Sequence, residues 1–243
     1  MPGQWATTVV AKEQLTPHML RIVLGGEALR EFPPGQESGY VKLLLEEDGK
    51  PLMRSYTIRA FDQSRCALTL DFVDHGDTGP ASRWARSARL GDALTIRGPG
   101  ERKLADSAAD WFLFAADMSA LPALAVNLKQ LARDAQGYAF MEVLGEADRQ
   151  PLDAPPGIEV QWLVNPRPES NRSVLSDAVR AAPWLPGRVY PWFAGEFDTM
   201  RDLRRYFRDE RQVDRRAMYL SSYWKIGATD EGMKAAKKAD TEA

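Results

Sequence analysis

The segment Arg54-Ser55-Tyr56-Thr57-Ile58-Arg59 combines residue types that could hold a flat, phosphate-bearing ligand. In an extended strand, successive side chains point to opposite faces. One face would carry Arg54 and Tyr56, a guanidinium beside an aromatic ring. The other face would carry the hydroxyls of Ser55 and Thr57. The segment therefore predicts a strand that offers stacking, hydrogen bonding and positive charge to one ligand.

A second segment, His75-Gly76-Asp77-Thr78-Gly79-Pro80-Ala81-Ser82-Arg83-Trp84, is typical of a loop that enters a short helix. Glycine allows a close backbone approach, Pro80 suits the first helical turn, and Ser82 can donate a hydrogen bond. The N–H groups at the start of such a helix would bind a pyrophosphate. Each segment alone is also compatible with a plain sheet surface or an ordinary turn. Together, in this order and between strands, they are far more specific.

Other catalytic signatures are missing from the sequence. It has no GxGxxG after a strand, no GxxxxGK[ST], no HExxH and no GxSxG, which disfavours classical dinucleotide binding, phosphoryl transfer and zinc proteolysis. One cysteine, Cys66, and two histidines cannot build the usual zinc or iron–sulfur sites. We therefore expect no metal bound by the protein's own ligands. Any iron would arrive in the ligands of another molecule.

Composition narrows the class of partner. The chain has 243 residues, with 32 basic and 34 acidic side chains interspersed and a net charge of -2. A nucleic-acid-binding protein more often has a basic excess on one face, so we expect no nucleic-acid partner. The N-terminal residues lack signal-peptide features, and no stretch is apolar enough to cross a bilayer. We expect a cytoplasmic monomer without membrane insertion.

The pattern of predicted elements changes near residue 103. Before it, β-branched and aromatic segments separated by turn residues predict six strands of a small closed antiparallel barrel. After residue 105, strand-like and helix-like segments alternate, as in a parallel α/β sheet. A polar, glycine-containing stretch joins the two. We predict domains at 1–103 and 104–243, the second ending in a polar helix that is a loosely held flap. The six predicted strands are 5–16, 18–26, 39–47, 54–61, 66–73 and 92–100.

Several motifs together resemble a known family. RxYTxR at 54–59 is followed by D-F-V-x-H-x-x-x-G-P-A-S-x-W-A at 71–85 and by G-D-x-L-x-I-x-G-P at 91–99. Later come DMSALPA at 117–123, Ala194-Gly195-Glu196 before an arginine-rich helix, and SYWK at 222–225. This series is similar to the siderophore-interacting proteins, or ferric-siderophore reductases, of the ferredoxin–NADP reductase superfamily. The resemblance covers nearly the whole chain.

The resemblance implies an N-terminal antiparallel β-barrel that binds FAD and a C-terminal parallel-sheet domain of the NAD(P)H-binding type. It places the donor site at Gly195 and Glu196, at the carboxyl end of a strand. For Glu196 an alternative to a role at the donor site has equal weight: an acidic side chain that complements the dipole at a helix N-terminus. The same alternative applies to Asp117. The residues that it implies for the cofactor are Arg54, Ser55, Tyr56, Thr57, Asp71, Phe72, Val73, His75, Gly79, Pro80, Ala81, Ser82, Asp117 and Ser119.

The implied chemistry is the reduction of iron(III) in a ferric siderophore. A nicotinamide, NADPH or NADH, gives two electrons, iron(III) takes one, and a flavin connects the two. Arg201 and Arg204 share a helix face and could bind the 2′-phosphate of NADPH, dock an acidic ferredoxin, or balance nearby acids. The basic residues expected at the substrate, each with an alternative as a solvated surface group, are Lys42, Arg102, Lys103 and Lys225.

Three hypotheses follow. The chain is a ferric-siderophore reductase, a related flavin-dependent oxidoreductase with another acceptor, or a protein that binds ferric siderophores with little turnover. Flavin content separates the third from the others, and a survey of acceptors separates the first two.

Overall fold

The computed structural model describes residues 3–76 and 79–241, and the chain divides into two compact units. The first runs to Leu104 and also includes Pro122–Gln130 and Glu146–Asp153. The second contains Ala105–Leu121, Leu131–Gly145 and Ala154–Ala243. The division of the chain between residues 103 and 104 stays a prediction.

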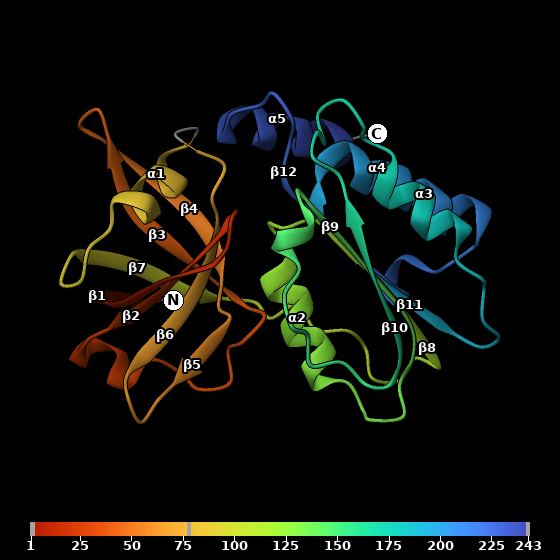
Figure 1. Cartoon of the computed structure of the whole chain (residues 1–243), viewed down its shortest axis with the longest axis horizontal. Coiled ribbons are helices and arrows are strands. Elements are labelled where there is room, and N and C mark those ends of the chain that lie inside the picture. Colours follow the sequence, from red (N-terminus) through yellow and green to blue (C-terminus); the bar gives the residue numbers. More distant parts are fainter. Residues whose placement is uncertain (1–2, 77–78, 242–243) are drawn as a thin grey trace. The chain divides into compact units, whose positions relative to one another are not determined.

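A seven-stranded antiparallel sheet forms the first unit (Figure 1). Its strand order is β4-β3-β7-β1-β2-β6-β5. Apolar residues alternate with polar ones along these strands, so one face covers a core and the other meets solvent. The core includes Phe72 of β6 and Leu43 of β3. The strands are β1 (Gly3–Thr16), β2 (Met19–Gly25), β3 (Tyr40–Glu47), β4 (Lys50–Thr57), β5 (Ala60–Asp62), β6 (Ala67–Val73) and β7 (Ala93–Gly100).

The prediction of one strand over 54–61 in a six-stranded closed barrel is wrong in detail. β4 and β5 are separate strands at the two ends of the sheet order, and no ladder joins them in the described residues. The chain bends at Ile58, whose N–H donates to Gly39, whereas the next N–H, of Arg59, donates to Thr69 of β6. One segment thus passes from pairing with β3 to pairing with β6, a change of partner that is typical of sheet corners.

The sheet of the second unit is parallel and has the order β10-β9-β8-β11-β12. The chain therefore starts in the middle, builds toward one edge and then reverses, which makes a topological switch point between β8 and β11. Every residue of β8 and β11 is buried, as expected for central parallel strands. The strands are β8 (Trp111–Ala116), β9 (Gln136–Val143), β10 (Gly157–Val164), β11 (Val189–Glu196) and β12 (Tyr219–Trp224).

Helices flank both sheets. α3 and α4 lie along one face of the parallel sheet and share its core (Figure 1). The helices are α1 (Pro80–Ser87), α2 (Leu121–Gln130), α3 (Val174–Ala181), α4 (Phe197–Arg205) and α5 (Asp230–Thr241). Short helical turns are η1 (Glu27–Glu31), η2 (Glu146–Asp148), η3 (Tyr206–Glu210) and η4 (Arg215–Ala217).

The predicted C-terminal helix is present as α5, but it is not loosely held. Met233 is buried within the core of the second unit. Near the other end of the helix, Asp240 forms ion pairs with Arg201 and Arg204 of α4. The apolar face of α5 is thin, but the buried Met233 side chain and the ion pairs of Asp240 both hold the helix against the second unit.

Candidate functional site

Tyr56 and Arg54 lie on the core side of β4. Their partners across the ladder are Val41 and Leu43, both fully buried. The Tyr56 ring stacks on Phe72 with ring centroids 4.2 Å apart, and Phe72 in turn contacts Trp84 of α1. Burial raises the pKa of Tyr56, which favours the neutral form of its hydroxyl even more strongly. The structure thus brings Tyr56 and Phe72, two predicted cofactor residues, into one aromatic stack.

Ser55 and Thr57 lie on the opposite face of β4, as the alternation predicts. Ser55 pairs with Lys42 of β3, and both side chains are exposed. Thr57 pairs with Tyr40 and is buried. The predicted substrate lysine therefore shares a sheet face with the two hydroxyls and not with Tyr56.

The Asp71 side chain points away from the core and interacts with two arginine side chains. Its carboxylate accepts hydrogen bonds from Arg21 Nε and Nη2 at 2.7 and 2.8 Å. The Nε of Arg59 lies 3.8 Å from the second Asp71 oxygen. With its side chain only 3% exposed, Asp71 is the shared anion between two guanidiniums. Its predicted contact with the cofactor stays a prediction, as does that of half-buried Val73 at the end of β6.

The predicted pyrophosphate loop leads into α1. Gly79 precedes the helix with φ +89° and, having no side chain, cannot itself cap the first turn. A Cβ at Gly79 would lie 3.2 Å from Cε1 of the exposed His75 ring, so glycine keeps this approach open. Pro80 occupies the first turn and Ala81 is buried beneath it. Asp77 and Thr78 lie outside the described residues.

Ser82 makes an internal hydrogen bond, and its predicted contact with the cofactor stays a prediction. It is 2% exposed, and its hydroxyl donates to the carbonyl of Gly76 at 3.2 Å. A hydroxyl has one proton to donate. In this arrangement Ser82 ties the loop to the helix, so a phosphate at the helix start would be held by backbone N–H groups in preference to its side chain.

Arg102 and Lys103 follow β7, and both side chains interact with neighbouring residues. Arg102 donates from Nε to the Glu37 carbonyl and from Nη2 to the Gln130 side chain. Lys103 forms a 2.8 Å ion pair with exposed Glu101. These two predicted substrate residues therefore have partners within the first unit.

In the second unit, Asp117 stands at the carboxyl end of β8, beside the switch point. Its carboxylate accepts from the Ser119 N–H at 2.8 Å, the Ser119 hydroxyl at 2.5 Å and Trp224 Nε1 at 2.7 Å. Burial raises the pKa of Asp117, and these hydrogen bonds oppose the rise. Gly195 passes so close that a Cβ there would lie 2.5 Å from Asp117 Oδ2. Asp117, Ser119 and Gly195 thus form one packed corner.

Glu196 is the N-cap of α4. Its Oε2 accepts from the N–H groups of Asp198 and Thr199, and its Oε1 accepts from the N–H of Ile226 after β12. It is 6% exposed. The simpler interpretation of Glu196, a helix N-terminal acid, therefore describes what its carboxylate does in this structure.

Glu142, at the end of β9, was missed by the sequence analysis. Its carboxylate accepts a 2.8 Å hydrogen bond from Asn165, which follows β10 and is 2% exposed. Burial raises the pKa of Glu142 to about 7, opposed by Asn165 and reinforced by the charges of Asp117 and Glu196. An acid within a strand-like segment gives no local signal. Only the parallel pairing of β8 and β9 brings it to the same edge as Asp117.

We expect Glu142→Gln to be more stable relative to the wild type as pH rises. The folded pKa lies above the ordinary value of about 4.5, so the folded state holds an extra proton between pH 4.5 and 7. Wild-type stability should therefore fall across this window, by on the order of 2 to 3 kcal/mol. Glutamine keeps an acceptor for Asn165 and removes the titration. Urea unfolding of both proteins from pH 5 to 8 measures the difference. A constant difference would contradict the assignment.

Three other predicted residues have partners in the second unit. Lys225 pairs with Asp198 at 2.8 Å and lies 4.7 Å from the centre of the Phe197 ring. Arg201 and Arg204 converge on the Asp240 carboxylate. Arg201 and Arg204 are therefore brought together, as the helical spacing predicts, but around an anion that the sequence analysis did not consider.

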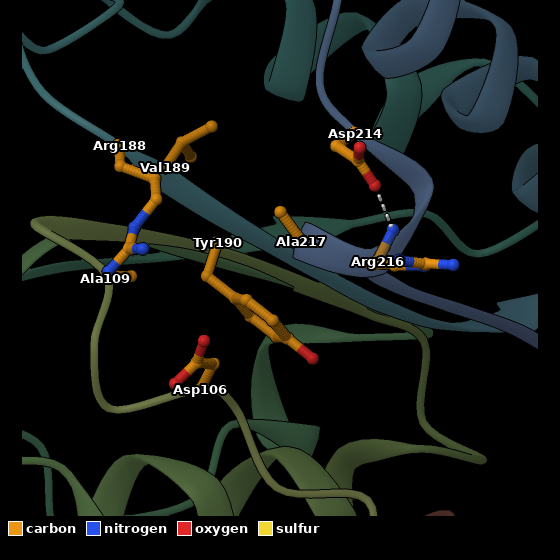
Figure 2. Close-up of a pocket in the computed structure, with 8 residues that line it drawn as sticks. All are labelled: Asp106, Ala109, Arg188, Val189, Tyr190, Asp214, Arg216 and Ala217. Carbon is orange, nitrogen blue, oxygen red and sulfur yellow. Dashed lines mark hydrogen bonds between the residues drawn. The ribbon is translucent and has the colours of Figure 1, made fainter.

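A small open pocket lies at the other edge of this sheet, where β8 and β11 begin. Figure 2 shows Tyr190, Arg188 and Asp106 among its lining residues. It is lined by none of the predicted site residues. Ligands of open parallel sheets bind at the carboxyl ends of the strands, which is the end where Asp117 lies and not the end of this pocket.

Two further observations concern the described residues. Among them, no helix is long and apolar enough to span a membrane. No group of three or more His, Cys, Asp or Glu side chains within residues 3–76 and 79–241 is arranged to hold a metal ion.

Comparison with known proteins decides the family. Residues 8–51 and 45–103 match the siderophore-interacting FAD-binding domain, and residues 109–227 match the siderophore-interacting protein family. The chain belongs to the siderophore-interacting protein family. The solved structure of the siderophore-interacting protein SipS from Aeromonas hydrophila is similar over 99% of this chain and 98% of its own, with 30% identity and a TM-score of 0.89.

Two named relatives of this family member are reductases. The ferric vibriobactin reductase ViuB of Vibrio cholerae is 32% identical over 91% of this chain and 89% of its own length. The NADPH-dependent ferric-chelate reductase of Escherichia coli is 31% identical over 89% of this chain and 91% of its own. The predicted fold class, the cofactor FAD and the class of enzyme, a ferric-chelate reductase, are confirmed.

Proposed function

We propose that this protein acts as a monomer in the cytoplasm and reduces iron(III) in ferric siderophores with electrons from NADPH. The observation that carries the proposal is the family match in both halves of the chain, together with relatives named as ferric-siderophore and NADPH-dependent ferric-chelate reductases. Bound FAD supplies the chemistry that accepts an electron pair and passes electrons on singly. Reduction weakens the hold of hard oxygen ligands on the iron.

The first unit has residues that fit FAD. Gly79, which has no side chain to cap the first turn of α1, keeps the start of the helix open, which suits a pyrophosphate. Tyr56 offers an aromatic ring braced by Phe72, and Arg54 lies on the same face of β4. We propose that these groups, with Ser55 and Thr57 as hydrogen-bonding residues, hold the flavin.

The second unit has residues that fit a donor with a phosphate. We propose that Arg201 and Arg204 receive the 2′-phosphate of NADPH in place of Asp240. A carboxylate already seated between both guanidiniums supports the view that this helix face binds anions. The corner of Asp117, Ser119 and Gly195 is proposed as the neighbouring part of the donor site.

The cofactor and the acceptor are tested together. The purified protein is expected to release FAD on acid treatment, identified by chromatography. Under anaerobic conditions NADPH should bleach the flavin, and a ferric siderophore should then restore its absorbance as a colorimetric chelator reports iron(II). Flavin that is reduced but reoxidised only by quinones or free flavin would point to another acceptor. Binding of the siderophore without reoxidation would favour a binding protein.

The donor is tested with paired variants of one contact. Arg204→Ala should raise the KM for NADPH, and Asp240→Asn should lower it because the competing carboxylate is gone. NADH, which lacks the 2′-phosphate, should respond little to either change. Equal responses of both nucleotides, or faster flavin reduction by reduced ferredoxin than by NADPH, would overturn this assignment of donor.

A further inference from the structure

His18, in the turn between β1 and β2, holds a deeply buried carboxylate in place. The Asp148 side chain is only 1% exposed, and both of its oxygens accept hydrogen bonds from His18. The His18 backbone N–H donates to Oδ1 at 3.0 Å, and ring Nδ1 lies 2.8 Å from Oδ2. An ionised carboxylate can only accept a hydrogen bond, so Nδ1 carries the proton. His18 therefore meets Asp148 with both its main chain and its ring.

Asp148 comes from a distant part of the chain. It belongs to η2, between β9 and β10, but the segment Glu146–Asp153 lies in the first compact unit with His18. A buried carboxylate is costly unless it is paired and hydrogen-bonded. Among the described residues, the hydrogen bonds of the Asp148 side chain all come from His18. Movement of His18 would therefore leave a buried charge without partners, so Asp148 fixes both the position and the ring orientation of this residue.

The carbonyl group of His18 holds the start of the predicted pyrophosphate loop. It accepts a 2.9 Å hydrogen bond from the N–H of Asp74, the first residue after β6. The Asp74 carboxylate accepts in turn from the N–H of Gly76 at 3.1 Å and lies 3.8 Å from Arg86 Nε in α1. A continuous series of contacts thus runs from Asp148 through His18 and Asp74 to the loop and to α1.

This series matters for FAD because the loop needs a fixed shape. A pyrophosphate at a helix start is bound by several backbone N–H groups, whose positions depend on the chain that leads into the helix. On the helix side, Ser82 holds the Gly76 carbonyl. On the sheet side, the hold depends on His18 and Asp74. A loop fixed at both sides loses less conformational freedom on binding and should bind its ligand more tightly.

We propose that His18, held by Asp148, is a positioning residue for FAD that keeps the pyrophosphate loop in its binding conformation. The inference rests on the proposed function, in which FAD binds at the start of α1. His18 acts through its carbonyl on Asp74 and needs no contact of its own with the cofactor. The two partners are 130 residues apart in the chain, so this role could not be recognised from the sequence.

The test measures FAD binding and loop protection without turnover. His18→Asn keeps an N–H donor near the position of Nδ1, whereas His18→Gln places its amide near the position of Nε2, away from Asp148. Titration of each apoprotein with FAD, followed by flavin fluorescence, gives the dissociation constant. It should rise about ten-fold in His18→Gln and change less than about two-fold in His18→Asn. Amide hydrogen exchange at Asp74 and Gly76 should become faster only in His18→Gln.

The two carboxylates of η2 provide a matched control. Asp148→Ala removes the buried partner of His18 and should weaken FAD binding at least as much as His18→Gln. Glu146→Ala removes an acid from the same turn but breaks only an exposed ion pair with Arg149, so FAD affinity should not change. Because His18 and Asp148 act as one unit, the double variant His18→Gln with Asp148→Ala should lose no more affinity than Asp148→Ala alone.

The outcomes separate the inference from the proposed site. Equal FAD affinities of His18→Gln, His18→Asn and wild type would overturn the inference and leave the proposed function intact. An equal loss in both variants also overturns it, because the donor at Nδ1 would not be the cause. Fast exchange of the Asp74 amide in the wild-type protein contradicts it even where a variant does not fold. If the wild type binds FAD but Gly79→Ala binds it equally well, the proposed pyrophosphate site itself is wrong.

Discussion

Gly195→Ala is expected to destabilise the second unit by about 3 kcal/mol and to slow reduction of the flavin by the donor. The added Cβ would lie 2.5 Å from Oδ2 and 2.9 Å from Cγ of Asp117. Asp117 cannot move aside easily, because two donors from Ser119 and one from Trp224 hold its carboxylate. The clash would therefore displace either the end of β11 or the whole Asp117 corner.

Urea unfolding followed by tryptophan fluorescence measures the loss of stability, and stopped-flow absorbance measures flavin reduction. Gly232→Ala is the matched control. Gly232 is exposed in α5, and the nearest atom to its added Cβ is 3.4 Å away, so alanine should be neutral or stabilising there. FAD content should stay normal in both variants. If Gly195→Ala changed neither the free energy of unfolding nor the rate of flavin reduction, the Asp117 corner would not be rigid.

Asp71→Ala is expected to cost about 3 to 5 kcal/mol of stability in the first unit. The substitution leaves Arg21, which donates two hydrogen bonds to Asp71, without its counter-charge. Removing one partner of a buried ion pair is strongly destabilising because the remaining charge is uncompensated. The Asp71 hydrogen bond is also the main cause that raises the pKa of Arg21. Thermal and urea unfolding measure the effect.

Glu47→Ala provides the comparison, since it breaks the more exposed ion pair with Arg83 and should cost no more than about 1 kcal/mol. The double variant Arg21→Met with Asp71→Leu should recover part of the lost stability because the charges are removed together. If Asp71 also contacts the cofactor directly, FAD affinity should stay low in the double variant even when stability returns.

Local patterns in the sequence are enough to predict side-chain directions, the two kinds of sheet and the family. Alternation along 54–57 correctly separated Arg54 and Tyr56 from Ser55 and Thr57, because side-chain direction in a strand depends only on position in the chain. The change from strand segments to an alternating α/β pattern predicted two kinds of sheet for the same reason. Short motifs such as RxYTxR and GPAS, taken in order, were enough to indicate the family and FAD.

Partnerships between distant residues were decided by the tertiary structure. The sequence offers no signal that Arg97 stands opposite Lys42, because register between β3 and β7 depends on how the whole sheet assembles. Nor does the sequence show that the Asp240 carboxylate would form ion pairs with Arg201 and Arg204. Asp240 lies 36 residues after Arg204 in the chain.

The edge of the parallel sheet illustrates the same division. Gly195 and Glu196 could be placed at the end of a strand from the sequence, but Glu142 could not be recognised, since an acid at the end of a strand-like run has no local mark of function. Its raised pKa arises from burial and from the carboxylates of neighbouring strands. Burial and electrostatic coupling depend on distances in space, and only the folded arrangement of β8, β9 and β11 sets those distances.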